Sequence, residues 1–175
     1  MIRTPEDILD FWFAPGMDEL WYADDPKFDA GIRYQFMQTY EAAKDGKLDA
    51  WRNQARSLLA LIIVFDQFPR NMFRGDRRAF ATDHLARSLT KQGIGKGFDQ
   101  ELSGAPLDFF YLPLMHSETL DDHQLLIERG RGEERYAREH RAIIERFGRY
   151  PQRNAALGRD CTPEESRFLE AEASD

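Results

Sequence analysis

Apolar residues recur along most of the chain every three or four positions, which is the spacing of one face of an α-helix. One such stripe steps by four through an early segment: Phe28, Ile32, Phe36 and Tyr40. Another occupies residues 136–147: Tyr136, His140, Ile143, Ile144 and Phe147. No stretch shows the alternation of period two, with turn dipeptides, that is typical of β-hairpins. The pattern therefore predicts an all-α fold.

Several helix ends are marked by their capping residues. Residues 4–7 (TPED) offer an N-cap hydroxyl, a proline at the first helical position and an acid at the third. Residues 162–165 (TPEE) repeat this signature near the end of the chain. Asp25, followed by a proline, begins another predicted helix, and Gly46 is well placed to end it.

The centre of the chain allows two interpretations. Residues 49–68 fit a buried helix that Pro69 ends or kinks. The run LLALIIVF within it also fits a buried strand, since periodicity does not separate the two when every face is apolar. Arg52 and Arg56 extend the pattern to helical length, which favours the helix.

Further along the chain, glycine and proline mark the expected ends of helices. Residues 79–92 predict a helix followed by a glycine-rich loop, GIGKG. Residues 107–112 predict a short apolar segment that Pro113 breaks, and another helix is expected to start near Glu118. In total we expect seven to nine helices joined by short turns, forming a single compact domain over residues 1–175.

Composition and charge narrow the class of protein. Hydrophobic residues make up 42% of the chain, which is ample for a packed core. The 31 acidic residues exceed the 24 basic ones, so the balance gives no support for nucleic-acid binding. The longest apolar run, residues 58–65, is too short for a membrane span. The single cysteine, Cys161, has no partner for a disulfide within the chain, and no signal segment precedes the first helix. These features favour a cytoplasmic location.

Two segments of the chain resemble each other. FDQFPRNMFRG at residues 65–75 and FGRYPQRNAALGR at residues 147–159 both run from an aromatic residue and proline to Arg-Asn, then to glycine. We call them the first and second Pro-Arg-Asn loops. They indicate either two similar exits from a helix or a duplicated half whose loops face one another. The separation of the two loops along the chain is longer than the period of tetratricopeptide repeats.

Four motifs together resemble a bacterial family labelled as a domain of unknown function. They are FDQFPRNMFRG, AFATDHLA, YLPLMHSE and RFGRYPQRNAALGR, and the likeness runs from FWF near residue 11 to the TPEE segment. The resemblance implies an all-helical fold in the tetratricopeptide-like superfamily and no established activity. It also implies a histidine where this chain carries Gln152, so a mechanism that needs an imidazole there is weakened.

The first candidate site is rich in arginine. Planar guanidinium groups near helix ends suit a phosphate or carboxylate ligand. The residues of this candidate come from both loops: Arg70, Asn71, Arg74, Arg149, Arg153, Asn154 and Arg159. The alternative is structural, with the arginines paired to local acids such as Asp66 and Asp76 to brace the turns.

The second candidate site combines the run His116, Ser117 and Glu118 with His140, and Asp66 is an optional further member. Imidazole and carboxylate groups serve as metal ligands and equally as a general acid–base pair. No HExxH spacing marks a metal site. The structural alternative makes His140 a core histidine and Glu118 a first-turn residue of its helix. No phosphate loop or dinucleotide fingerprint occurs, and the pattern specifies neither a cofactor nor an oligomeric state.

The sequence thus favours a helical binding module for an anionic small molecule or a peptide carboxylate, held by the two Pro-Arg-Asn loops. A hydrolytic or metal-dependent enzyme using His116, Glu118 and His140 is the alternative. A third possibility is a structural partner of another protein, which needs a sizeable exposed apolar patch.

Overall fold

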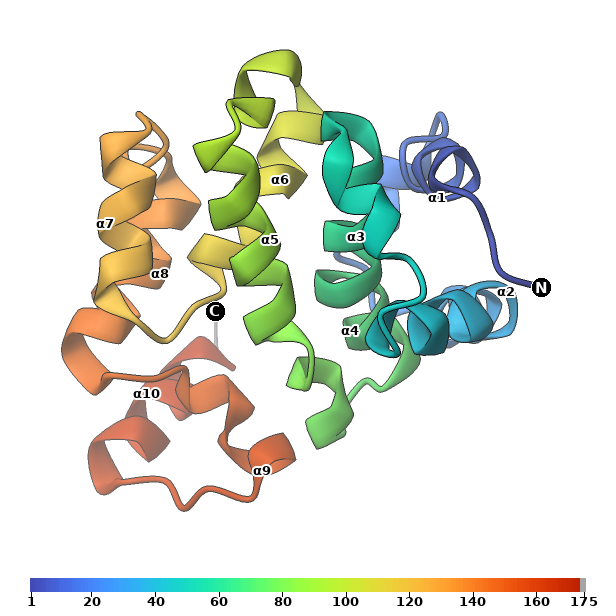
Figure 1. Ribbon diagram of the computed structural model, residues 1–175. Helices are drawn as coiled ribbons and strands as arrows, with labels where there is room; N and C mark the ends of the chain where they lie inside the picture. Colours follow the sequence, from blue (N-terminus) through green and yellow to red (C-terminus); the bar gives the residue numbers. More distant parts are fainter. Residues whose placement is uncertain (174–175) are drawn as a thin grey trace. The chain divides into compact units, whose positions relative to one another are not determined.

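The computed structural model describes residues 1–173, and within that range it contains helices and no strand (Figure 1). The prediction of an all-α fold is confirmed. Eight α-helices have eight or more residues: α1 (Pro5–Trp12), α2 (Pro26–Lys44), α3 (Ala55–Asp66), α5 (Asp83–Gly95), α6 (Ala105–Met115), α7 (Leu120–Glu128), α8 (Arg135–Phe147) and α10 (Pro163–Glu172).

Shorter elements connect these helices. Two are single α-helical turns: α4 (Phe68–Met72) and α9 (Asn154–Leu157). The others are 3-10 helices: η1 (Met17–Glu19), η2 (Asp49–Asn53), η3 (Arg77–Phe80), η4 (Phe98–Glu101) and η5 (Pro151–Arg153). Counting the longer helices alone agrees with the seven to nine that the sequence predicts.

The chain divides into two compact units. Unit 1 comprises Met1–Arg74 and Arg78–Pro113, and unit 2 comprises Gly75–Arg77 and the chain from Leu114 onward. The single domain over residues 1–175 stays a prediction.

The predicted helix starts are confirmed by the hydrogen bonds that cap them. The Thr4 hydroxyl accepts from the Asp7 backbone N–H at 3.2 Å, and the Asp7 carboxylate accepts from the Thr4 N–H at 2.9 Å. The same reciprocal box joins Thr162 and Glu165 at the start of α10. Asp25 caps α2 by accepting from the next two N–H groups that follow the proline. Each cap satisfies backbone donors that the first helical turn leaves open.

Helix α3 starts later than its apolar pattern predicts. Residues 49–53 form the separate element η2, and Gln54 has an extended backbone that interrupts the helical path. The Ser57 hydroxyl donates to the Trp51 carbonyl at 2.7 Å and so ties the two elements together. Of the two central interpretations, the buried helix is confirmed over Ala55–Asp66.

The predicted glycine-rich loop was wrong in part, because α5 continues through Gly95. A Cβ atom at Gly93 would lie 2.8 Å from the Phe110 ring and 3.2 Å from Leu58 Cδ2. The glycine therefore permits a close approach between α5 and its neighbours, a tertiary requirement that the local sequence does not express. Likewise Pro113 lies inside α6 instead of breaking it.

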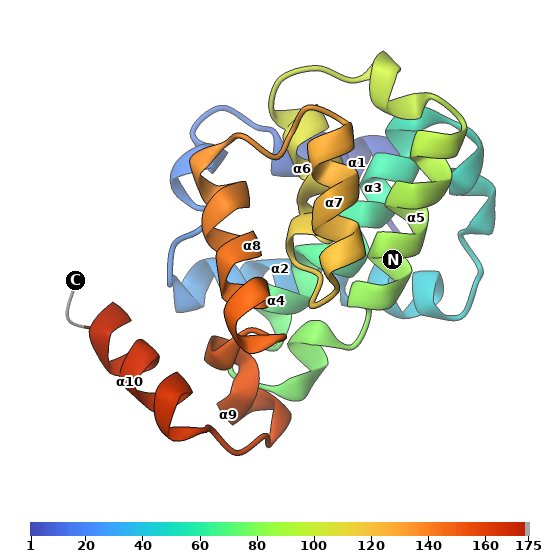
Figure 2. The same ribbon diagram turned by 90° about the vertical axis from the view of Figure 1, so that its left-hand side faces the viewer.

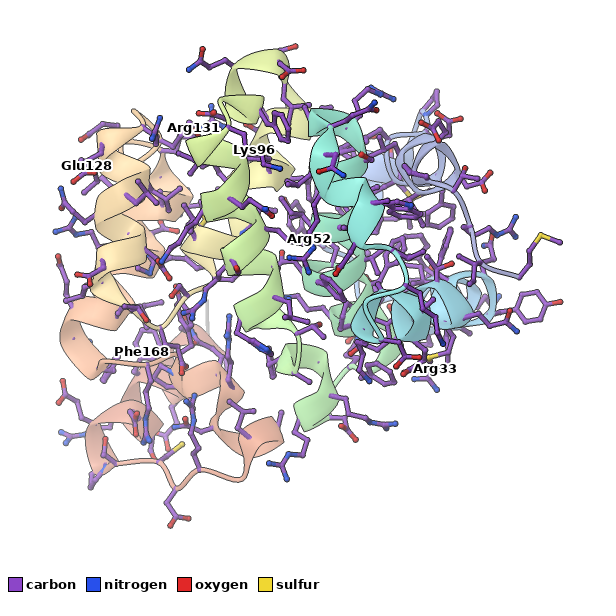
Figure 3. The ribbon with its side chains drawn as sticks, viewed as in Figure 1. Arg33, Arg52, Lys96, Glu128, Arg131 and Phe168 are labelled. Atoms are coloured by element: carbon purple, nitrogen blue, oxygen red, sulfur yellow. The ribbon has the colours of Figure 1, made fainter. Side chains whose placement is uncertain are left out.

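The core of unit 1 surrounds α3. This helix packs against α1, α2, α4 and α5, and ten of its twelve residues are buried. Aromatic side chains fill the space beside it (Figure 3), with Phe68 stacked on Phe36 at 4.6 Å and Trp12 edge-on to Phe109 at 5.6 Å. No helix in the described part of the chain is long and apolar enough to cross a membrane.

Unit 2 is formed mainly by the helices at the end of the chain. Helix α7 packs against α8, and η5 contacts both α9 and α10; Figure 2 shows α10 following η5 and α9. Gly148 ends α8 with a φ of 67°, a conformation that glycine adopts without a steric penalty. The chain then enters η5 through the buried Tyr150, which places the second Pro-Arg-Asn loop beside the end of α8.

Candidate functional site

A groove of about 650 Å³ lies in unit 2 between α8, η5 and α10. Its apolar wall comes from Ile143 and Phe147 on α8 and from Phe168 on α10; Figure 3 labels Phe168. Its polar lining includes His140, Arg146 and Arg153. Pockets of this size, with mostly apolar walls and a few polar groups, are typical of sites that bind small organic ligands or chain termini.

Two arginines of the groove lie over aromatic rings. The guanidinium carbon of Arg146 is 4.6 Å from the Phe147 ring centroid, and that of Arg153 is 4.7 Å from the Tyr150 centroid. Arg146 also donates to Glu164, and Arg153 donates to the His116 carbonyl, each at 2.8 Å. Ring stacking restrains each planar fork, so less side-chain entropy is lost when it binds a ligand.

The imidazole of His140 contacts the backbone of its own helix. Its Nδ1 lies 2.8 Å from the Tyr136 backbone carbonyl one helical turn earlier. A carbonyl oxygen only accepts hydrogen bonds, so in the neutral ring Nδ1 carries the hydrogen and Nε2 is the acceptor. The ring centroid is 5.7 Å from that of Tyr150 and 6.5 Å from that of His116. The groove thus combines arginine donors with one imidazole acceptor.

An ion pair behind the groove holds the second loop in place. Arg159 donates to both Glu118 oxygens at 2.8 and 2.9 Å, and to the Tyr150 carbonyl at 3.0 Å. The Tyr150 N–H donates to the same carboxylate at 2.8 Å. Burial opposes ionisation of Glu118, but the hydrogen bonds from Arg159 and Tyr150 outweigh it and lower the pKa of this carboxyl. Arg159 also donates to the Asn154 side-chain oxygen at 2.8 Å.

A second ion pair attaches α10. Arg149 donates to both Glu165 oxygens at 2.6 and 2.8 Å and to the Asp160 carbonyl at 2.9 Å. The Glu165 side chain is only 3% exposed. The bidentate hydrogen bond from Arg149, helped by the Thr162 N–H, lowers the pKa of Glu165 to about 2.

Acid should therefore loosen α10. The pKa of Glu165 is about 2 in the folded protein against an ordinary value of 4.5, so its stabilising effect is present above pH 4.5 and lost as the pH falls toward 2. We expect thermal unfolding, followed by circular dichroism from pH 6 to 2.5, to show falling stability across this window. The Glu165→Gln variant should be less stable at pH 6 and have a shallower pH dependence. Parallel curves for the two proteins would contradict this account.

The comparisons with known proteins fit this architecture. The model of the family described as "Bacterial protein of unknown function (DUF924)" matches residues 8–173. The chain belongs to this family. It is also similar to a solved structure of a protein of unknown function from Agrobacterium tumefaciens, with 42% identity and a TM-score of 0.88. That match covers 95% of this chain and 97% of the other. The comparison with curated proteins gives no match. The prediction of a bacterial family of unknown function is confirmed.

Residues 65–74 of the first Pro-Arg-Asn loop lie in unit 1, where they join helices. Arg70 pairs with Asp66 at the end of α3 and with Asp83 at the start of α5, at 3.3 and 3.2 Å. Asn71 and Arg74 both donate to Asp29 on α2, at 2.8 and 2.7 Å.

The effect of these bonds on Asp29 is electrostatic as well as structural. Burial opposes its ionisation, but the hydrogen bonds from Arg74 and Asn71 hold its pKa below the ordinary range. These contacts match the bracing role that was the structural alternative for the loop.

The structure brings together only part of the predicted trio of His116, Glu118 and His140. The two imidazole rings are neighbours, whereas the Glu118 carboxylate is engaged by Arg159. Among residues 1–173, no group of three His, Cys, Asp or Glu side chains is arranged to hold a metal ion.

Some groups at the site were not found from the sequence. Arg146 and Phe168 line the groove but lie outside both loops, and the only hint for Arg146 was its position beside the apolar stripe of α8. His123 on α7 was also missed; it is not a lining residue of the groove but is buried, with Nε2 2.9 Å from the Ser117 carbonyl, and burial lowers the pKa of its imidazole. Gln152 also lines the groove and donates to Glu172 at 2.7 Å.

Proposed function

We propose that this protein is a binding module for an anionic small molecule or a peptide carboxylate, and that the groove of α8, η5 and α10 is its binding site. The observation that supports the proposal is the pair of ring-stacked arginines, Arg146 and Arg153, beside one apolar wall. The participation of the first Pro-Arg-Asn loop in the same site stays a prediction. The use of a single cysteine favours a cytoplasmic location.

The chemistry of the lining defines the kind of ligand. A guanidinium fork binds a carboxylate through two parallel hydrogen bonds, which an apolar group cannot provide. The wall of Ile143, Phe147 and Phe168 stabilises an apolar body, because its burial removes hydrocarbon surface from water. A ligand with one acidic end and one apolar end satisfies both requirements.

Arg153 should determine the affinity of the groove for an acidic ligand. With 3-phenylpropionate as the probe, titration followed by NMR should show saturable shifts of resonances from groove residues. The Arg153→Gln variant should bind at least about tenfold more weakly, as expected for loss of a charge-assisted hydrogen bond. Arg138→Gln is the matched control, because Arg138 is an exposed arginine on α8 that does not line the groove.

The outcome that contradicts the proposal is equal affinity in the wild type and Arg153→Gln, or the absence of any shift in the groove. Circular dichroism of the variant separates a local loss of binding from a loss of folding. A local loss of binding leaves the helical signal unchanged, whereas a loss of folding reduces it.

The enzyme alternative retains one supporting observation, the 6.5 Å between the His116 and His140 rings. The bidentate pairing of Glu118 with Arg159 opposes it, because a carboxylate held in this way is a weak general base. Hydrolysis of a p-nitrophenyl ester tests this alternative. A rate that does not differ between the wild type and His116→Ala removes it.

A further inference from the structure

We infer that the groove recognises the C-terminal residue of a peptide whose last side chain is apolar, in preference to a simple organic acid. This rests on the proposed function, since it specifies the ligand of the same groove. The distinguishing chemistry is an amide N–H adjacent to a carboxylate. An N-acylated amino acid shares this chemistry, and the experiment below separates the two sources.

The carboxylate is assigned to the arginine side of the groove. Arg153 extends from η5 over the Tyr150 ring, and Arg146 extends from α8 over Phe147, so both cations border the same hollow. Two acids also line it: Glu139, which accepts from Arg135 at 2.6 Å, and Glu172, which accepts from Gln152 at 2.7 Å. A phosphate dianion would be repelled more strongly by these acids than a single carboxylate.

The amide N–H is assigned to His140. Because its Nδ1–H donates to the Tyr136 carbonyl, the neutral ring contributes Nε2 as a hydrogen-bond acceptor among the groove residues. A simple carboxylic acid has no donor for this nitrogen once it is ionised. The last residue of a peptide carries its N–H one carbon away from the carboxylate. A site that contains such an acceptor discriminates against ligands that leave it unpaired.

The apolar side chain is assigned to the wall of Ile143, Phe147 and Phe168. The Phe147 and Phe168 centroids are 5.1 Å apart with the rings tilted by 51°, so together they form a surface for one further aliphatic or aromatic group. One face of the groove therefore accepts the last side chain, and the arginine and histidine groups accept the ends of the backbone.

The test compares N-acetyl-L-phenylalanine with 3-phenylpropionate by calorimetric titration. The two probes share the ring and the carboxylate, but only the first has the amide N–H. We expect N-acetyl-L-phenylalanine to bind the wild type at least about tenfold more tightly, and its C-terminal amide to bind at least about tenfold more weakly than the acid. In His140→Phe the preference for the acetylated probe should disappear, whereas Arg138→Gln, which alters an exposed residue outside the groove lining, should retain it. Far-ultraviolet circular dichroism of His140→Phe shows that the variant is folded.

The outcomes separate the two levels of the proposal. Equal affinity of both acids for the wild type overturns the peptide inference and leaves the anion-binding groove intact. Failure of either acid to bind overturns both. A tripeptide, N-acetyl-Gly-Gly-Phe, distinguishes the sources: affinity equal to or above that of N-acetyl-L-phenylalanine supports a peptide terminus. Weaker binding of the tripeptide overturns it in favour of a small N-acylated amino acid.

Discussion

The Glu118→Ala variant is expected to unfold with a free energy about 2–3 kcal/mol below that of the wild type, since it leaves a partly buried guanidinium without its carboxylate. Glu118 accepts two hydrogen bonds from Arg159 and one from the Tyr150 N–H, so its removal affects both ends of the second Pro-Arg-Asn loop. Urea denaturation followed by far-ultraviolet circular dichroism at pH 7 measures the difference. Since the pKa of Glu118 is lowered in the fold, the difference between variant and wild type should shrink as the pH falls below the ordinary range of the carboxyl.

The matched control for this change is Glu133→Ala. Glu133 is 88% exposed and lies 3.7 Å from Arg138, so the loss of this surface ion pair should cost less than about 1 kcal/mol. A similar, small loss in both variants would show that Glu118 contributes no more than a surface charge. The Glu118→Ala variant should also bind the groove probes more weakly, because Tyr150 supports the stacked Arg153.

The Phe68→Ala variant should have the largest effect of all, a loss of about 3–5 kcal/mol in the free energy of unfolding. The Phe68 side chain is fully buried in unit 1, where it stacks on Phe36 at 4.6 Å and meets Trp12 edge-on at 5.7 Å. Removal of its ring deletes apolar contacts and leaves a cavity that a close-packed interior fills only in part. Urea denaturation again provides the measurement.

Two further variants define the cause of this effect. Phe68→Leu retains most of the apolar volume and should lose less than Phe68→Ala. Tyr34→Ala, in which a 91% exposed ring is removed, should change stability by at most about 0.5 kcal/mol. Equal losses in Phe68→Ala and Phe68→Leu would indicate that ring stacking, and not the volume of the cavity, determines the cost.

The helices were predictable where their signals are local. The capping residues at positions 4–7 and 162–165 act on backbone donors within one turn. The starts of α1 and α10 could therefore be predicted from the sequence. Gly93 shows the opposite case. A local pattern assigns it to a loop, but contact with Phe110 and Leu58 from other helices requires a residue without Cβ inside α5. Pro113 inside α6 is similar, since its missing N–H was expected to break the segment.

Some of the residues at the candidate site were predictable from the sequence, but which residues lie together in the groove was not. The sequence identifies Arg153 and His140 as candidate ligand-binding residues, and both line the groove of unit 2. It does not indicate that Arg146 and Phe168 join them, because α10 is brought to α8 by the pairing of Arg149 with Glu165 across sixteen positions. The acids that pair with Arg149 and Arg159 follow from the packing of helices, whereas the pairing of Asp66 with Arg70 is local and could be expected from the sequence.

Each of the two units contains its own spectroscopic probe. All three tryptophans, Trp12, Trp21 and Trp51, belong to unit 1. The only cysteine of the sequence, the exposed Cys161, belongs to unit 2, where its sulfur lies 3.3 Å from the Asn154 amide nitrogen. A thiol-reactive dye can therefore be attached at one site without removing any other cysteine. Intrinsic fluorescence and dye emission then follow the two units in one sample, so coincident unfolding curves define one cooperative fold and separate curves define two.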